Sequence, residues 1–163
     1  MKSMNQISRT LFFSLLCVTF LFSACKKDDD VTTKTDLLTS SSWKITALTI
    51  DPALPTFDNE GNITGSTNDL FAMLEDCSKD DIYSFNTDKT LSMDEGASKC
   101  DNSDPQKSTG SWSFNSDETT LTIKVEEYPE TMSILELTDK VLKLKSTEVD
   151  GGMTISTTIT FSR

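Results

Sequence analysis

The side chains in this sequence that could take part in chemistry are carboxylates, hydroxyls and cysteines, because the chain contains no histidine. A set of carboxylates spaced along the middle of the chain offers candidates for general acid and base groups: Asp80, Asp81, Asp94, Glu95, Asp101 and Asp104. They fall at expected strand ends and in turns, where acidic residues commonly face solvent. Without histidine, a nucleophile and base pair or a zinc site would need unusual partners. We therefore expect no enzymatic activity and no catalytic residue.

Two short segments carry several oxygen ligands of the kind that calcium prefers. They are Asp58–Asn62 and Asp101–Asp104. Neither segment has the ligand spacing of an EF-hand loop, so any binding would be weak. We expect no metal site and no cofactor.

Cys77 and Cys100 are the only cysteines outside the N-terminal segment, which carries the marks of export. Exported domains fold in an oxidising compartment, so a disulfide between these two residues is the default expectation. It would close a loop of about two dozen residues, worth on the order of 3 kcal/mol in the chain-entropy description. A catalytic thiol is disfavoured, because there is no Cys-x-x-Cys spacing and no histidine to lower a thiol pKa. We predict a structural disulfide.

The N-terminal segment predicts an export signal. Lys2 and Arg9 provide a positive start, and the apolar stretch Leu11–Phe22 is too short for the roughly 20 residues of a spanning helix. Leu21–Cys25 then looks like the cleavage box of a lipoprotein signal peptide, with small residues before the cysteine that becomes lipidated. We predict a lipoprotein signal peptide over residues 1–24 and lipidation of Cys25. The alternative is an ordinary secretory signal with Cys25 left as a free thiol.

The residues after Cys25 predict how the protein is held. Several acyl chains on this cysteine would bind a membrane firmly, whereas a single chain binds marginally. Residues 25–36 are polar and lack periodicity, so we expect a flexible tether. The tether includes Lys26–Asp30, whose Lys-Asp-Asp core is similar to an export signal for the outer face of the outer membrane in one Gram-negative phylum; the alternative is a solvated charge run. We predict a lipid anchor in the outer membrane of a Gram-negative bacterium, on its periplasmic or its surface-exposed side.

The charge of the chain excludes nucleic acid as a partner. The sequence has 15 basic and 26 acidic residues, and removal of Lys2 and Arg9 with the signal peptide changes the formal charge from −11 to −13. Such a surface repels phosphate backbones. No protein partner is indicated.

Residues 37–163 read as one domain of strands, because apolar and polar residues alternate in short runs. The runs are bounded by turns rich in Asp, Asn, Ser and Gly. They are Ser42–Ala47, Asp81–Phe85, Thr90–Met93, Gly110–Phe114, Thr120–Val125, Ser133–Thr138, Leu142–Lys145 and Met153–Phe161. This spacing predicts an all-β fold, an antiparallel up-and-down β-barrel of about eight strands.

Two interruptions are expected in this pattern. Asp51–Asn68 reads as a long loop, because Pro52 and Pro55 break any regular run, and Pro129 should end a strand. Leu70–Glu75 should form a short helix within the loop, bringing apolar residues over a barrel opening. A loop with its own apolar plug is often functional. It could equally cover a sheet edge.

Three segments carry a resemblance to a known family. Cys77–Thr90, Asp94–Pro105 and Gly110–Trp112 resemble the lipocalin-like domain found in many bacterial lipoproteins, and the likeness covers about Leu37 to Arg163. The resemblance implies a barrel whose bottom is closed by the tryptophan of the first strand, here Trp43. It also implies that Arg163 stacks on that indole as a cation–π pair, within about 6 Å.

The resemblance also implies a candidate ligand site in the barrel interior. Its lining would be the inward apolar side chains Trp43, Tyr83, Phe85, Trp112, Phe114, Leu135, Leu144, Ile155 and Phe161. Every lysine on a clear strand points outward, and a buried carboxylate without a cation is costly. We therefore expect a small, hydrophobic and neutral ligand, or one that is held at the rim by the Asp51–Asn68 loop. The alternative is a structural or protein-interaction module whose interior is filled by aromatic side chains and by Met93 and Met153, because a barrel of this size barely exceeds its own side chains.

Overall fold

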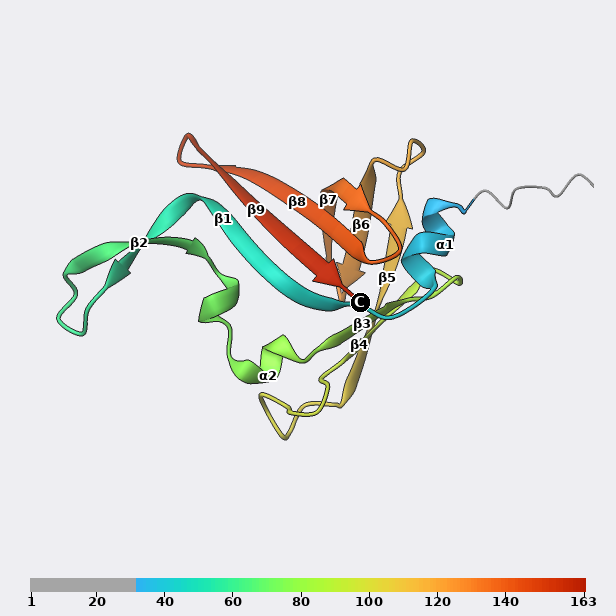
Figure 1. Cartoon of the computed structure of the whole chain (residues 1–163), viewed down its shortest axis with the longest axis horizontal. Helices are drawn as coiled ribbons and strands as arrows, with labels where there is room; N and C mark the ends of the chain where they lie inside the picture. The colour runs from blue at the N-terminus through green and yellow to red at the C-terminus, as the bar shows by residue number, and fades with distance from the viewer. Residues whose placement is uncertain (1–31) are drawn as a thin grey trace, which may run out of the picture. The chain divides into compact units, whose positions relative to one another are not determined.

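The alternating pattern produces a single antiparallel sheet of nine strands in the computed structural model, which describes residues 32–163. Across the sheet the strands follow the order β2-β1-β9-β8-β7-β6-β5-β4-β3, an up-and-down arrangement (Figure 1). The all-β antiparallel prediction is confirmed, with nine strands instead of eight. In chain order the elements are α1 (Lys34–Thr39), β1 (Lys44–Phe57), β2 (Ile63–Asp69), η1 (Phe71–Met73, a 3-10 turn), α2 (Asp76–Lys79), β3 (Ile82–Phe85), β4 (Thr90–Asp94), β5 (Lys107–Phe114), β6 (Thr120–Val125), β7 (Tyr128–Leu137), β8 (Val141–Asp150) and β9 (Met153–Ser162).

The N-terminal predictions lie outside the described residues. These are the signal peptide over residues 1–24, the lipidated Cys25 and the first part of the tether. Residues 34–36, the last part of that tether, belong to α1. Thr33 begins this helix with a capping box, in which its hydroxyl accepts a hydrogen bond from Asp36 N and the Asp36 carboxylate accepts one from Thr33 N. The packed domain therefore starts a few residues earlier than expected.

The sheet curls so that β3, the last strand in the sheet order, meets the residue before β1. Trp43, just before β1, forms an isolated antiparallel bridge with Tyr83 of β3. Each backbone nitrogen donates to the carbonyl of the other residue at 2.8 Å. Strand β2 continues beyond this junction as a two-stranded extension with the outer half of β1 (Figure 1). One end of the curled sheet, which we call the closed end, is thus bridged between the residue before β1 and the edge strand β3.

The expected loop over residues 51–68 is wrong, because this segment forms the β1–β2 hairpin. Strand β1 leaves β9 after Asp51, and its residues Leu54–Phe57 pair with β2 alone. A proline lacks the backbone N–H of a sheet ladder, so it fits a strand that is paired on one side only. Pro129 has the same explanation. It lies within β7 and pairs with Lys124 of β6, in a part of β7 that β8 does not reach. The prediction that Pro129 ends a strand is therefore wrong.

Two irregularities in strand register turn predicted inward residues outward. The register of β7 against β8 shifts between Ile134 and Glu136, and Leu135 is left 54 % exposed. A shift between Ile45 and Ala47 similarly places Ala47 opposite Thr160 on the outer face of β9. An extra residue in one strand reverses the alternation beyond it. The predicted inward position of Leu135 is therefore wrong, and Ala47 does not continue the inward face of Trp43 and Ile45, as simple alternation along Ser42–Ala47 would have it.

The segment between β2 and β3 contains the expected short helical structure, as η1 followed by α2. Leu70 and Leu74, which flank η1, are half-buried, whereas Met73 is 65 % exposed. Met73 therefore does not plug an opening of the barrel.

Candidate ligand-binding site

The closed end of the curled sheet is filled with apolar side chains. Ten buried residues form one cluster, and none of them exposes more than 3 % of its surface: Leu38, Trp43, Phe85, Leu91, Trp112, Leu121, Met132, Leu142, Leu144 and Phe161. Leu38 comes from α1, so this helix supplies a core residue. Burial of apolar area on this scale is the main force that holds the domain together.

Trp43 is fixed from two sides at the closed end. Its indole Nε1 donates a hydrogen bond of 2.9 Å to Leu38 O, which ties the first strand to α1. The Arg163 guanidinium lies over the ring, with Cζ 4.0 Å from the ring centroid, and this confirms the predicted cation–π pair. The same guanidinium donates to Leu37 O and, at 2.6 Å, to Asp139 O. The end of the chain thus joins α1, the first strand and the β7–β8 turn.

Trp112 has two partners of the same kinds, a backbone carbonyl and a side-chain cation, and the sequence did not predict them. Its Nε1 donates to Asn86 O at 3.0 Å, and Lys89 Nζ lies 3.8 Å from the ring centroid. Phe85 and Phe114 pack edge-on against this ring, with centroids 6.0 and 5.4 Å away. A lysine in the β3–β4 turn therefore covers the second tryptophan, as the C-terminal arginine covers the first.

The predicted lining residues divide into three groups. Trp43, Phe85, Trp112, Leu144 and Phe161 belong to the buried cluster, and Tyr83 and Phe114 pack against it. Ile155 is half-buried nearer the β8–β9 turn, while Leu135 points outward. Most of the predicted set therefore forms the packed core of the closed end. Met153, also expected inside, is 56 % exposed beside that turn and is a further correction.

The opposite end of the sheet, toward the β8–β9 turn, we call the open end. Ile155 of β9 lies there and is half-buried. Met93 and Ile123 are also half-buried, but they pack against the buried cluster and pair across the strands with Tyr83 and Trp112. Across the described residues, no polar or charged side chain is buried. Lys143 and Lys145 pair with Thr160 and Thr158 on the outer face of β9. These lysines lie outward as expected, but Ile123 and Ile155 have Glu130 and Glu148 as cross-strand partners, so exposed carboxylates share their face of the sheet.

Two hollows of the surface lie outside this interior. One of about 300 Å³ is lined mainly by polar residues of the outer face, among them Thr49, Asp51, Lys145, Ser156 and Thr158. The other, of about 260 Å³, is bounded by Ser41, Ser42, Lys44, Thr46, Ser162 and Arg163. An apolar molecule prefers an apolar lining. The first hollow, with its mainly polar lining, is therefore a poor site for a hydrophobic ligand.

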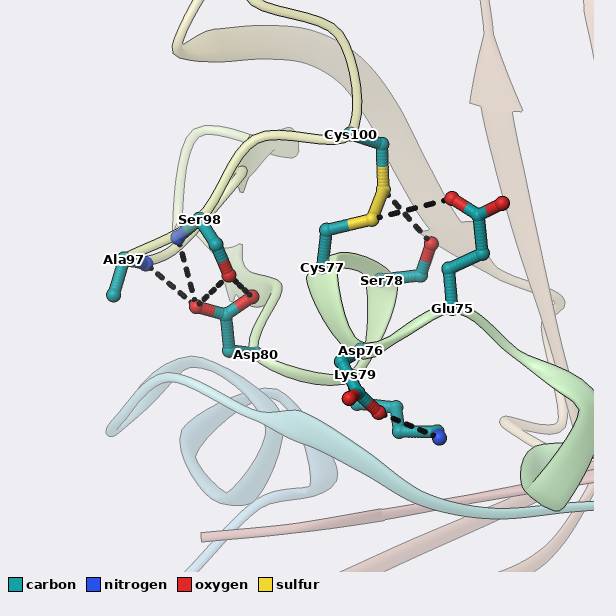
Figure 2. The surroundings of a disulfide bond; sticks show 9 residues. All are labelled: Glu75, Asp76, Cys77, Ser78, Lys79, Asp80, Ala97, Ser98 and Cys100. Carbon is teal, nitrogen blue, oxygen red and sulfur yellow. Dashed lines mark hydrogen bonds and ion pairs between the residues drawn. A yellow bond between two sulfur atoms is a disulfide. The ribbon is translucent and has the colours of Figure 1, made fainter.

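The predicted disulfide is confirmed: Cys77 and Cys100 are bonded, with their Cα atoms 5.2 Å apart (Figure 2). It joins α2 to the loop between β4 and β5. The Asp80 carboxylate strengthens this junction by accepting hydrogen bonds from Ala97 N at 2.7 Å and Ser98 N at 3.0 Å. Glu75 lies beside the two sulfurs, but sulfurs bonded to each other offer no thiolate for a metal.

Several of the candidate carboxylates gather near the disulfide. Burial raises the pKa of Asp81 to about 6, and the negative charges of Glu95, Asp80 and Asp94 add to the shift. Its Oδ1 atom is buried and lacks a hydrogen-bond partner. Burial, together with Asp81 and Glu95, also raises the pKa of Tyr83 to about 12. This described cluster therefore contains a carboxylate whose charged form is disfavoured, but it contains no nucleophile paired with a base.

The hydrogen-bonded carboxylates behave in the opposite way. Burial raises the pKa of Asp80, but the hydrogen bonds from Ala97 and Ser98 outweigh it, and the pKa is lowered overall. Hydrogen bonds from Gln106 and Lys107 lower the pKa of Asp94. These residues fix loop geometry as anions.

The two possible calcium segments are ordinary turns. Asp58 accepts hydrogen bonds from Glu60 N and Asn62 N, both at 2.9 Å, within the β1–β2 turn. Asp101 accepts from Ser103 N at 2.8 Å in the β4–β5 loop. Their carboxylates already serve the local backbone.

Among residues 32–163, the helices are too short and too polar to serve as membrane-spanning segments.

Comparison with known proteins gives one family. The sequence model of the lipocalin-like domain matches residues 40–144. No curated protein matches the chain. Among solved structures, a deswapped triple mutant of bovine odorant binding protein is similar at 15 % identity and a TM-score of 0.39, covering 76 % of this chain and 72 % of that one.

Proposed function

Because the chain belongs to the lipocalin-like domain family, we propose that it binds a small, neutral and hydrophobic molecule on the inner face of the open end. We further propose that acyl chains on Cys25 hold it at the outer membrane of a Gram-negative bacterium. The protein is then an anchored binding protein and not an enzyme.

The observation that carries the ligand proposal is the contrast between the two ends of the interior. The closed end is packed around Trp43 and Trp112, whereas Ile155, nearer the other end of β9, is only half-buried. No described charged side chain is buried there to neutralise a carboxylate. Burial of an unpaired charge is expensive, so a fatty acid is disfavoured and a neutral molecule is favoured.

The anchoring proposal rests on the sequence around Cys25 and gains support from the start of the domain. The first described element, α1, packs at the closed end, where Leu38 is buried and Lys34 Nζ donates to Glu118 O at 2.5 Å. The tether thus joins the domain at its closed end. The open end is then the end farther from the attachment point, accessible to a ligand from solution.

The alternative is an interaction module that acts through its hairpins. The filled closed end favours it, because ten buried side chains already occupy much of the interior. A carrier holds a bound apolar molecule, whereas an interaction module of this kind holds none.

Mass spectrometry of the purified chain separates them. The carrier predicts a neutral lipid or other small apolar molecule that co-purifies at close to one per chain under native conditions and is lost on denaturation. A stoichiometric fatty acid would contradict the neutral ligand. A chain that never carries an apolar molecule, even after incubation with a membrane extract, would favour the module.

A further inference from the structure

The β1–β2 hairpin exposes a group of apolar side chains that the packed interior does not use. Leu54, Phe57 and Ile63 expose 39, 58 and 70 % of their surfaces. Phe57 and Ile63 are direct partners across the two strands, so their side chains lie on one face of the hairpin. Grouped exposed apolar residues of this kind mark interaction surfaces more often than isolated ones do.

The same hairpin presents an unprotected strand edge. In the described domain β2 ends the sheet and pairs with β1 alone, over seven residues (Figure 1). Its sequence contains no lysine and no proline, the residues that usually prevent another strand from adding to an edge. The strand at the other end of the sheet, β3, is four residues long and is bridged to Trp43. The β2 edge therefore offers free backbone donors and acceptors along the whole strand, whereas β1, β7 and β8 are paired on one side only over shorter stretches.

Acidic residues predominate on this hairpin. Beyond Lys44 at the start of β1, residues 45–78 contain no lysine or arginine, and residues 45–69 carry four carboxylates. The carboxylates are Asp51, Asp58, Glu60 and Asp69. Lys145 of β8 lines a hollow together with Asp51, whereas the cations that cover the closed end lie away from the hairpin. A complementary partner is therefore basic, whereas a second copy of the hairpin or an anionic bilayer would bring like charges together.

We propose that the β1–β2 hairpin docks an extended segment of a partner protein that contains lysine or arginine, and that this segment adds to the outer edge of β2 as a further strand. Backbone hydrogen bonds to β2 fix its register. Alternate apolar side chains of the segment pack on Phe57 and Ile63, and its cations lie near Asp51 and Glu60. The proposal concerns a different surface from the interior and does not rest on the proposed ligand.

The experiment measures binding of a defined peptide to the full chain, as the cell processes it, in detergent. The probe is a fluorescent nine-residue peptide in which valine alternates with lysine and threonine, and protein-free micelles are the blank. A second peptide has the same side chains but N-methyl groups on alternate backbone nitrogens. Strand addition predicts that N-methylation weakens binding about tenfold or more, because it removes the donors of the new ladder. Equal binding of the two peptides would overturn the proposal, because charge alone would then explain it.

Protein variants locate the surface. Phe57→Ser with Ile63→Ser should weaken binding of the unmodified peptide about tenfold. Asp51→Asn with Glu60→Gln should weaken it severalfold and reduce its salt dependence. The matched control is Tyr128→Ser with Leu135→Ser, which removes two exposed apolar side chains from β7 and should leave the affinity unchanged. Equal losses in the control would overturn the assignment to the hairpin.

Two further outcomes would replace the proposed occupant. Sedimentation that shows a dimer, lost in the Phe57→Ser and Ile63→Ser variant, would assign the hairpin to a second copy. Binding to phosphatidylcholine vesicles that requires the same two residues in the Cys25→Ser chain, whose lipid anchor is removed, would assign it to a lipid surface. Either result contradicts a basic partner segment.

Discussion

The guanidinium of Arg163 lies 4.0 Å from the centre of the Trp43 ring, so the last residue of the chain covers the residue that precedes its first strand. The same side chain donates hydrogen bonds to the backbone of α1 and of the β7–β8 turn. One side chain therefore contacts Trp43, α1 and the β7–β8 turn at once.

Arg163→Ala should lower the free energy of unfolding by about 1–2 kcal/mol, because it removes the cation–π contact and two charge-assisted hydrogen bonds. Arg163→Lys should recover only part of this, because an ammonium cannot reach both carbonyls while it covers the ring. Denaturant unfolding measures the effect. Lys124→Ala, on an outer strand position, is the control, and an equal loss there would show that the position of Arg163 is unimportant.

Replacement of Cys77 and Cys100 by serine should destabilise the domain by about 3 kcal/mol, because a constraint on the unfolded chain is lost. The two residues are separated by 23 positions. Hydrogen exchange should rise chiefly in α2 and the β4–β5 loop, which the bond joins. Unfolding transitions that coincide with and without reductant would contradict the structural role.

Gly96→Ala should be more destabilising than Gly61→Ala, although both glycines have positive φ, 70° and 87°. A Cβ at Gly96 would lie 2.5 Å from Asp80 O, whereas one at Gly61 would meet nothing within 4 Å. We expect about 1 kcal/mol of backbone strain at Gly61 and about 1–3 kcal/mol more at Gly96. Thermal unfolding of the two variants measures the difference, and equal losses would mean that the β4–β5 loop moves freely from Asp80.

Asp81→Asn should stabilise the protein at neutral pH. The folded pKa of Asp81 is about 6, above the ordinary value of 3.8, so the folded state binds more protons than the unfolded state between these values. Stability attributable to this group therefore falls as pH rises through that window, and the benefit of the variant should vanish below its lower limit.

Asp94→Asn provides the opposite control. Hydrogen bonds from Gln106 and Lys107 lower its folded pKa, so this carboxylate stabilises the protein above its unfolded pKa and loses that effect in acid. The variant should be destabilised at neutral pH and nearly unchanged in acid. Parallel pH profiles for the two variants, measured by thermal unfolding, would refute the assigned environment of Asp81.

The sequence predicted the class of fold because period-two alternation is a local property that each strand carries by itself. It also predicted the disulfide, on the expectation that the domain is exported, and the pairing of Arg163 with Trp43, which the family resemblance implied. The inner position of Leu135 failed because the register shift in β7 depends on how its partner strands twist. Composition does not reveal where such an extra residue is absorbed.

Other differences have equally specific causes. Pro52 and Pro55 were read as breaks, yet Pro52 lies at the register irregularity between Thr49 and Leu54, and Pro55 lies where β1 pairs with β2 alone. The contact of Lys89 with Trp112 depends on the course of the β3–β4 turn, which no pattern indicated. The start of α1 did have a signal, since Thr33 and Asp36 have the spacing of a capping box.

The most direct test of the proposed function is fluorescence titration of the chain with N-phenyl-1-naphthylamine, a neutral apolar probe, compared with an anionic fatty-acid probe. We expect saturable binding of the neutral probe, at one molecule per chain. It also predicts that Ile155→Trp, which fills the open end, abolishes this binding, whereas Thr154→Trp, on the outer face of the same strand, does not. Preferential binding of the fatty acid, or neutral binding that Ile155→Trp leaves intact, would contradict it.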